Sequence, residues 1–246
     1  MTYHNDSVVA RRLAKRVASA QPDTPPIHFN STPAPEGLSD HLRKHLAGGE
    51  THYTARPGIP ELRALIGSEI ERRGGPSRDA DGVIVTHGEG EALYVTLLGL
   101  GLGADPTIVV AEKCRHRKLF DLLDIAVVDP SQTSAATAMA SYREFGDESS
   151  AAAVAGTTES IGILALGGFL FSSESRSPGA TTLPSSAILI GHLDSVPGLD
   201  HFRIGYVAGP PEIVKRIQTW KQALSICTAG PSQRATLFAI EKERAS

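Results

Sequence analysis

The chain has 246 residues, and its 24 Lys and Arg against 27 Asp and Glu give a formal net charge of −3. This near balance excludes a broadly basic surface of the kind that binds nucleic acid or anionic lipid. Hydrophobic residues make up 41% of the chain, enough for one substantial core, and no run approaches the roughly 20 apolar residues of a membrane span. The two cysteines are too few for a disulfide framework, and no signal peptide is apparent, so we expect a cytoplasmic protein.

The first third of the chain favours helices. Apolar residues at helical spacing predict a helix over residues 7–20, followed by a proline-rich extended arm over residues 21–35. A second helix is predicted over residues 37–47, before a Gly-Gly pair. A third begins at Pro60, which suits a first helical turn, and runs to the pair Gly74-Gly75.

From residue 82 onward, short β-branched runs alternate with helical stretches. The predicted strands are residues 83–86, 107–111, 125–128, 187–190 and 203–208. The predicted helices cover residues 88–101, 113–123, 212–224 and 232–244. An apolar stretch at 151–155 and a long polar loop at 172–186 complete the pattern. Such alternation indicates an α/β fold, a three-layer arrangement of a mostly parallel sheet with helices covering it.

Three motifs follow one another in a fixed order. They are His52–Arg63 (HYTARPGIPELR), Val85–Leu93 (VTHGEGEAL) and Phe202–Val207 (FRIGYV). In this order they resemble the class I/II aminotransferases, the fold-type I enzymes that use pyridoxal 5′-phosphate (PLP). The resemblance implies an aminotransferase-like large domain over residues 51–246. It also implies that residues 1–50 form a helix and arm that wrap a second subunit in a homodimer.

The resemblance further suggests a shortened member of the family. The chain ends soon after the helix that would begin the next domain, so we expect the C-terminal small domain to be missing, together with the arginine that grips a substrate carboxylate. The expected ligand is a small molecule, and an anionic one.

The turn Gly88-Glu89-Gly90 connects a strand to a helix. Its backbone N–H groups would lie at the positive end of the helix, where a phosphate or another anion binds readily. In the family this turn holds the cofactor phosphate, and the resemblance assigns the two helping side chains to Tyr53, donated by the partner subunit, and to Arg203. The alternatives are a packed surface aromatic for Tyr53 and a structural ion pair for Arg203.

The lysine that forms the Schiff base in the family is absent. It should lie eight residues before the phosphate arginine, and that position is Ser195. The two phosphate-binding serines of the same motif are replaced by His192 and Asp194. The ring-stacking aromatic aligns near Arg115, and the stretch 164–169 contains no carboxylate for the pyridinium nitrogen. We therefore leave the cofactor open and do not expect PLP to be covalently bound.

None of the seven lysines lies at the Schiff-base position. By analogy Lys113 lies nearer the pocket and is the only credible substitute for the missing amine. Lys221, in the helix predicted after the arginine strand, is expected to be a solvated helix residue.

Polar residues replace the cofactor ligands. The resemblance gathers His192, Asp194, Ser195 and His201 around the former cofactor cleft, and we predict them as catalytic residues. Further residues expected nearby are His52, His87, Glu89, Glu159 and Asp200. Imidazoles and carboxylates within reach of each other can divide the roles of base, acid and orienting partner. The same residue types could hold Zn²⁺, or could simply have drifted to polar types. A Ser/His/Asp hydrolase is disfavoured because no Gly-x-Ser-x-Gly surrounds Ser195.

Three hypotheses on function follow. The first is an aminotransferase-fold protein that performs acid–base catalysis on a small metabolite without PLP, in a biosynthetic pathway. The second is a non-catalytic pseudoenzyme that binds a ligand or serves as a scaffold, with Arg115 and Arg203 as a possible anion clamp. The third is a residual PLP-binding enzyme.

Overall fold

The computed structural model describes residues 33–50, 53–102, 107–110, 114–128, 140–144, 161–171, 187–196, 198–199 and 202–245. The predicted helix over residues 7–20 and nearly all of the predicted arm lie outside the described residues, as do the stretch 151–155 and the loop 172–186.

The centre of the fold is a seven-stranded sheet with the order β1-β7-β6-β5-β4-β2-β3. The strands are β1 (Val83–His87), β2 (Thr107–Val110), β3 (Ala126–Val128), β4 (Ala140–Glu144), β5 (Ile161–Ala165), β6 (Ile188–His192) and β7 (Ile204–Ala208). Only β7 runs against its neighbours, β1 and β6. The prediction of a mostly parallel sheet is confirmed, and the carboxyl ends of six strands meet the start of β7 at one edge.

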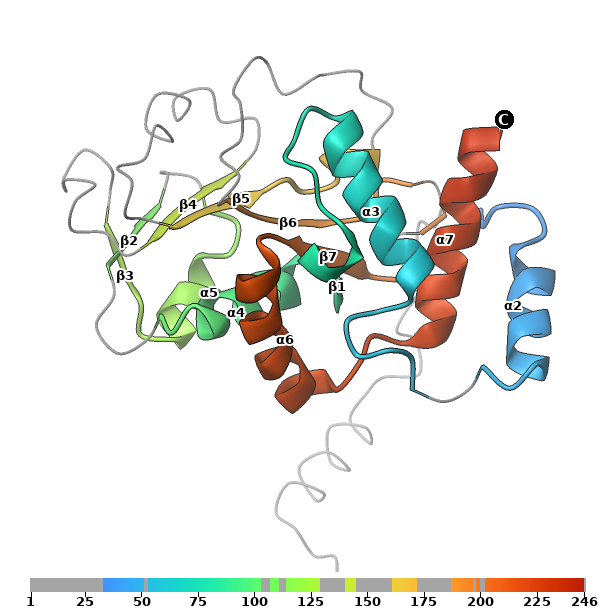
Figure 1. Cartoon of the computed structure of the whole chain (residues 1–246), viewed down its shortest axis with the longest axis horizontal. Helices are drawn as coiled ribbons and strands as arrows, with labels where there is room; N and C mark the ends of the chain where they lie inside the picture. The colour runs from blue at the N-terminus through green and yellow to red at the C-terminus, as the bar shows by residue number, and fades with distance from the viewer. Residues whose placement is uncertain are drawn as a thin grey trace, which may run out of the picture. The chain divides into compact units, whose positions relative to one another are not determined.

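Helices cover both faces of this sheet (Figure 1). On one face lie α3 (Pro60–Arg72) and α7 (Gly230–Ala245), and on the other lie α4 (Gly88–Gly99), α5 (Arg117–Leu122) and α6 (Pro211–Ser225). Side chains of β7 alternate between the two cores, because Tyr206 and Ala208 pack with α3 whereas Val207 packs with α4 and α6. The three-layer α/β class is confirmed.

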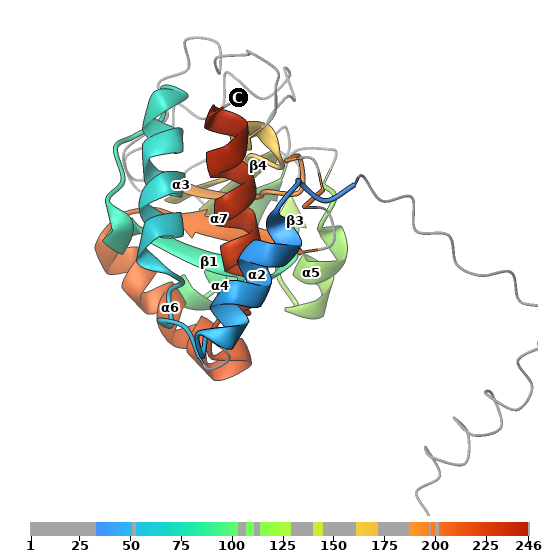
Figure 2. The ribbon, with the colours of Figure 1, turned by 90° about the vertical axis from the view of Figure 1, so that its right-hand side faces the viewer.

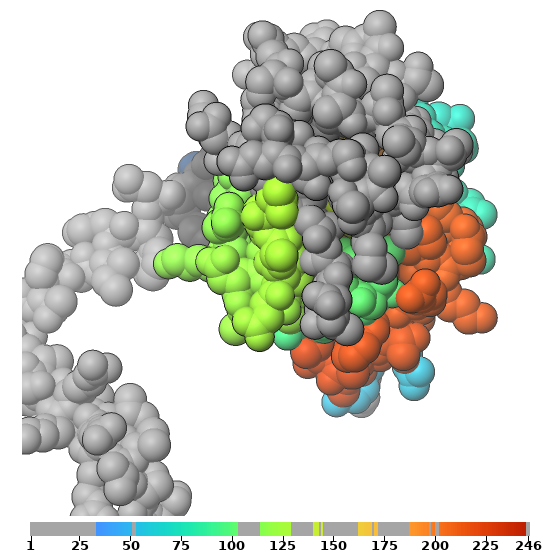
Figure 3. All heavy atoms as spheres, turned by 90° about the vertical axis from the view of Figure 1, so that its left-hand side faces the viewer, coloured from blue at the N-terminus to red at the C-terminus, as the bar shows by residue number. Residues whose placement is uncertain are grey.

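Two elements lie at the margins of the layers. Helix α2 (Leu38–Ala47) contacts α7 on the side away from the sheet (Figure 2). The edge that carries β3 and α5 faces the viewer in Figure 3, with α6 beside it. Within the described part of the chain, no helix is long and apolar enough to cross a membrane.

The sequence analysis did not predict strands β4 and β5. Their sequences, ASYRE and IGILA, contain charged residues or a glycine and lack the β-branched run that marks β1 and β6. Both strands lie inside the sheet, where pairing with neighbours on both sides offsets a weak intrinsic preference. Short 3₁₀ turns, η1 (Ala80–Gly82) and η4 (Phe169–Phe171), precede β1 and follow β5.

The prediction that Lys221 is solvated was wrong. Lys221 is fully buried in α6, because it follows Val214 and Ile217 at helical spacing and shares their inward face. Its Nζ donates a hydrogen bond to Ser225 Oγ at 3.2 Å. Burial lowers the pKa of this ammonium, against the attraction of Glu91 and Cys227.

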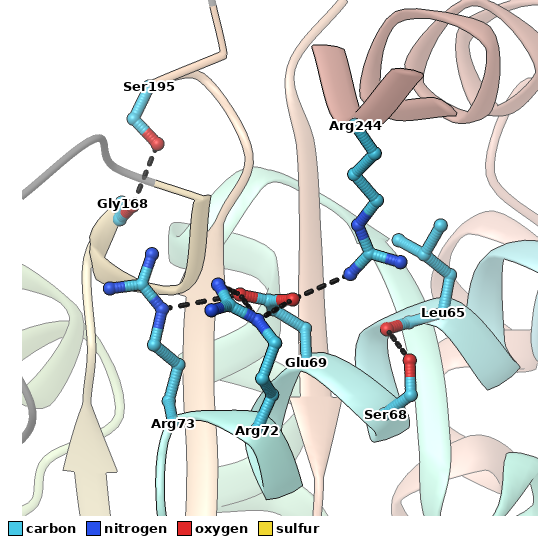
Figure 4. Close-up of polar contacts among 8 residues, drawn as sticks. All are labelled: Leu65, Ser68, Glu69, Arg72, Arg73, Gly168, Ser195 and Arg244. Carbon is cyan, nitrogen blue, oxygen red and sulfur yellow. Dashed lines mark hydrogen bonds and ion pairs between the residues drawn. The ribbon is translucent and has the colours of Figure 1, made fainter. Parts of the chain in front are cut away.

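A buried carboxylate joins α3 to α7. The Glu69 side chain is 2% exposed and binds the guanidinium groups of Arg72, Arg73 and Arg244 (Figure 4). Arg244 of α7 donates to Oε2 at 2.6 Å, and Arg73 donates to Oε1 at 3.2 Å. Burial disfavours the charged form, but the three arginines outweigh it and lower the pKa of Glu69. Both carboxylate oxygens are therefore satisfied.

Candidate functional site

The candidate site lies at the edge where the parallel strands end. In open α/β sheets, ligands bind in the crevice outside the carboxyl ends of the strands. Here β6 ends at His192, β5 leads into a Gly167-Gly168 turn, and β1 leads into α4 at Gly88. We call this region the strand-end site and define it by Gly88, Glu89, Arg115, Gly168, His192 and Arg203.

The turn at the start of α4 is formed by close backbone contacts. Gly88 has φ 73°, a left-handed conformation that favours glycine. A Cβ on Gly205 of β7 would lie 2.3 Å from the Gly88 carbonyl carbon, so only glycine fits there. A Cβ on Gly88 would lie 3.8 Å from Nη2 of Arg203. The structure thus brings Gly88, Glu89, Gly90 and Arg203 together, as the anion-binding prediction requires.

Arg203 itself is unusual in two respects. It has φ 50°, a conformation that non-glycine residues seldom adopt and that is often found at functional sites. Among the described residues, no hydrogen bond or ion pair engages its exposed guanidinium group. The side chain of the N-cap residue, His87, makes no capping hydrogen bond to the first N–H groups of α4. An exposed cation therefore lies beside the N-terminal end of α4, the end of a helix that favours anions.

Glu91 supports this turn from within α4. Its Oε2 accepts the His87 backbone N–H at 2.6 Å and lies 3.0 Å from His87 Nδ1, while Ser225 Oγ donates to Oε1 at 2.6 Å. Burial alone would raise the pKa of Glu91, but these hydrogen bonds and the charge of Lys221 lower it to about 2. We did not predict this role, although a glutamate in the first turn that reaches back to the N-cap is a known sequence signal.

A second set of charges surrounds the Glu89 side chain. Glu89 is 5% exposed, and its Oε1 lies 3.0 Å from both Arg115 Nη2 and His116 Nε2. Arg115 also binds Glu144, through its backbone N–H at 2.7 Å and through Nε at 3.3 Å. Glu144 and His116 were not predicted. Glu144 ends the strand β4 that the sequence did not reveal, whereas His116 directly follows Arg115.

The Gly167-Gly168 turn connects this set to the predicted catalytic residues. His192 donates its backbone N–H to Gly167 O at 2.9 Å, and Ser195 Oγ donates to Gly168 O at 2.7 Å (Figure 4). A Cβ on Gly168 would lie 2.9 Å from Ser195 Oγ and 3.2 Å from His192 Cε1, so these two side chains meet at the turn. On the other side, the Arg115 guanidinium lies 3.4 Å from the Cβ position of Gly167.

His192 and Asp194 form a pair beside this turn. Nδ1 of His192 lies 3.6 Å from Oδ2 of Asp194, within ion-pair distance. The structure therefore brings His192, Asp194 and Ser195 together. His201 lies outside the described residues, as do His52, Glu159, Asp200 and Lys113.

Tyr53 lies elsewhere in its own chain. Its side chain is 77% exposed, and among the described residues no hydrogen bond or ion pair joins it to Gly88, Glu89 or Arg203. A contact donated to another subunit, as predicted for Tyr53, would need such an exposed position.

The described residues of the strand-end site do not fit a lysine-linked PLP. Ser195 supplies no amine, and Arg115, engaged by two carboxylates, lies where a stacking aromatic is expected. The turn after β5 contains no carboxylate for a pyridinium nitrogen. Within the described part of the chain, only the phosphate end of the cofactor has matching groups, at the α4 turn and Arg203. Among the described residues, no group of three or more His, Cys, Asp and Glu is placed to hold a metal.

Comparison with known proteins agrees with this architecture. A segment of 66 residues is 35% identical to a probable aspartate aminotransferase from Methanocaldococcus jannaschii, covering 27% of this chain and 18% of the relative. An aromatic aminotransferase from Pyrococcus horikoshii superimposes with a TM-score of 0.72 at 16% identity. The chain has the fold-type I architecture of the aminotransferases it resembles.

The coverage of these comparisons is partial. The chain covers 67% of the Pyrococcus protein, with 88% of its own residues aligned. It covers 64% of an Escherichia coli protein described as having a methionine aminotransferase function, with 87% of its own residues aligned, a TM-score of 0.70 and 21% identity. The matched segment spans less than a fifth of the Methanocaldococcus relative. No protein-family model matches the chain.

Proposed function

We propose that the strand-end site binds a small anionic metabolite and performs acid–base catalysis on it without a lysine-linked cofactor. The observation that carries this proposal is the meeting of His192, Asp194 and Ser195 at the Gly168 turn, at the position where the resemblance expects the Schiff-base amine. An imidazole next to a carboxylate is a suitable general base or acid near neutral pH.

Each residue has a defined part in this proposal. The guanidinium of Arg203 and the N–H groups at the start of α4 bind the anionic end of the ligand. His192 accepts or donates the proton, the Asp194 carboxylate interacts electrostatically with the imidazole from 3.6 Å, and Ser195 offers a hydroxyl to the substrate. Acid–base catalysis of this kind contributes typically about 10²–10⁴-fold in rate.

The acid–base step can be tested before any substrate is known. The full chain is incubated in D₂O with a panel of small carboxylates and phosphates, and proton NMR follows the exchange of carbon-bound hydrogen. We expect exchange in at least one compound, and a loss of about 100-fold or more in His192→Gln. Binding without exchange would favour the scaffold hypothesis, and exchange that persists in His192→Gln would overturn the assignment of His192.

A residual PLP enzyme is the second candidate, favoured by the likeness to an aspartate aminotransferase and by the groups that match a phosphate. Incubation with PLP, reduction with borohydride and mass spectrometry of the peptides distinguish the two. We expect no lysine adduct in the natural chain, and Ser195→Lys serves as a positive control. An adduct on Lys113 would contradict the proposal. So would an adduct on another lysine whose replacement by alanine abolishes both the adduct and the activity.

We also propose that the protein is a homodimer. Large apolar side chains are exposed on and near α6, with Trp220 at 45%, Leu224 at 50% and Tyr53 at 77%. The segment that carries Tyr53 is fixed to this end of α6, since Arg56 donates to Gln222 Oε1 at 3.2 Å. Such a surface suits burial against a second copy. Sedimentation should show a dimer that Trp220→Glu dissociates, and a monomeric natural chain at micromolar concentration would contradict it.

A further inference from the structure

Several buried polar atoms at or beside the strand-end site have no hydrogen-bond partner in the described part of the chain, and Nδ1 of His192 is one of them. Two others are Oε2 of Glu89, whose residue is 5% exposed, and the hydroxyl of the fully buried Tyr206. Buried polar groups are almost always hydrogen-bonded, and an unpaired one costs about 1–3 kcal/mol. Two of them in one site therefore indicate a missing partner.

Contacts around Gly167 place these two side chains in the same region. The Tyr206 hydroxyl and Gly167 O lie 2.4 and 2.7 Å from the Cβ position of Gly191. Arg115 contacts the same Gly167 and binds Glu89. Burial raises the pKa of Tyr206, and the nearby charge of Glu89 raises it further.

The charges indicate what kind of partner is missing. Glu89 and Glu144 are two carboxylates that share one guanidinium, Arg115. Glu89 Oε2 can only accept a hydrogen bond, so the partner must donate, and a cationic donor makes the stronger, charge-assisted bond to a carboxylate.

We propose that Glu89 and Tyr206 form an ammonium subsite, which binds the amine of a small ligand whose anionic end lies at Arg203. An ammonium group has three donors, enough to satisfy the carboxylate and the phenol oxygen together. This inference rests on the proposed anion site and narrows its ligand class to molecules that carry both an amine and a phosphate or carboxylate. A water molecule would satisfy the same atoms without selecting such ligands.

Matched ligand pairs test the subsite by titration calorimetry on the full chain. O-phosphoethanolamine is compared with ethyl phosphate, 3-aminopropyl phosphate with propyl phosphate, and 4-aminobutyrate with butyrate, so that the pairs distinguish spacing and the type of anion. We expect at least one aminated member to bind about tenfold or more tightly than its partner, as a charge-assisted hydrogen bond allows. In Glu89→Gln this ratio should fall to near one.

Two variants keep the test decisive. Glu144→Gln also breaks an ion pair with Arg115, but both oxygens of Glu144 have partners, so it should keep the ratio. Tyr206→Phe leaves the Arg115 contacts intact and should lower the ratio even if Glu89→Gln misfolds.

Equal binding of all pairs by the natural chain, or an unchanged ratio in both Glu89→Gln and Tyr206→Phe, would overturn the subsite. If instead no phosphate binds, or Arg203→Ala leaves ethyl phosphate binding unchanged, the proposed anion site itself fails.

Discussion

In the part of the chain that the structure describes, two buried glutamates pair with arginines, and they differ in how completely their carboxylate oxygens are hydrogen-bonded. Glu69, between α3 and α7, has both carboxylate oxygens bound by a total of three guanidinium groups. Glu89, at the strand ends, has one oxygen bound by Arg115 and His116 and the other without a partner among the described residues. A satisfied network stabilises helix packing, whereas an incomplete one at a strand end indicates a ligand site.

The largest difference should appear in stability. Glu69→Gln leaves three arginines facing a neutral amide and should lower the free energy of unfolding by about 2–3 kcal/mol. Glu89→Gln removes a carboxylate that is only half satisfied, and should cost less than about 1 kcal/mol. Urea denaturation measures both, with the exposed Glu71→Gln as a control within about 0.5 kcal/mol of the natural chain. Equal losses for the two buried glutamates would remove the distinction.

The next effect concerns the support of the α4 turn and depends on pH. Because the folded pKa of Glu91 is about 2, below its ordinary value near 4.5, its contribution is complete above pH 4.5 and is lost as the pH falls toward 2. We expect about 2 kcal/mol of stability to disappear across this window, after allowance for solvent screening. The melting temperature of Glu91→Gln should depend less on pH there, and identical pH profiles would contradict the assignment.

A smaller effect tests the contact of the Gly168 turn with the side chains of Ser195 and His192. Gly168→Ala would place a methyl group 2.9 Å from Ser195 Oγ and 3.2 Å from His192 Cε1. Displacing these side chains should cost about 1–2 kcal/mol. Chemical shifts of the His192 ring should move in this variant, and unchanged shifts together with unchanged stability would show that the turn does not position these residues.

The smallest effect has the opposite sign. A Cβ on Gly90 would meet nothing within 4 Å, and Gly90 lies inside α4. Gly90→Ala should therefore stabilise the protein by roughly 0.5 kcal/mol, because alanine loses less backbone entropy in a helix. A loss of stability would mean that the α4 turn is more tightly packed than the contacts indicate.

The sequence predicted the parts of the fold that local pattern determines. Apolar periodicity located α2, α3, α4, α6 and α7, and β-branched runs located β1, β2, β3, β6 and β7. It did not reveal β4 or β5, which depend on pairing within the sheet. Lys221 was misjudged because a lysine on an inward helix face has the same local signal as one at the surface.

The candidate site was predictable only where motif spacing carries it. The spacing placed Ser195 relative to Arg203, and the strand-to-helix glycine turn placed Gly88 beside that arginine. The pairing of Glu89 with Arg115 brings together residues 26 positions apart, from two strand ends, and no local signal indicates it. The unpartnered oxygen of Glu89 is a property of packing alone.

The central claim is that the anion site lies at Arg203 and the start of α4. Binding of inorganic phosphate tests it most directly, because it compares Arg203 with an arginine of the Glu69 cluster. Titration calorimetry compares the natural chain with Arg203→Ala at the strand ends and Arg244→Ala in the Glu69 cluster. The account predicts that Arg203→Ala weakens phosphate binding by about tenfold or more, whereas Arg244→Ala leaves it unchanged. Loss of binding in Arg244→Ala with normal binding in Arg203→Ala would contradict the account.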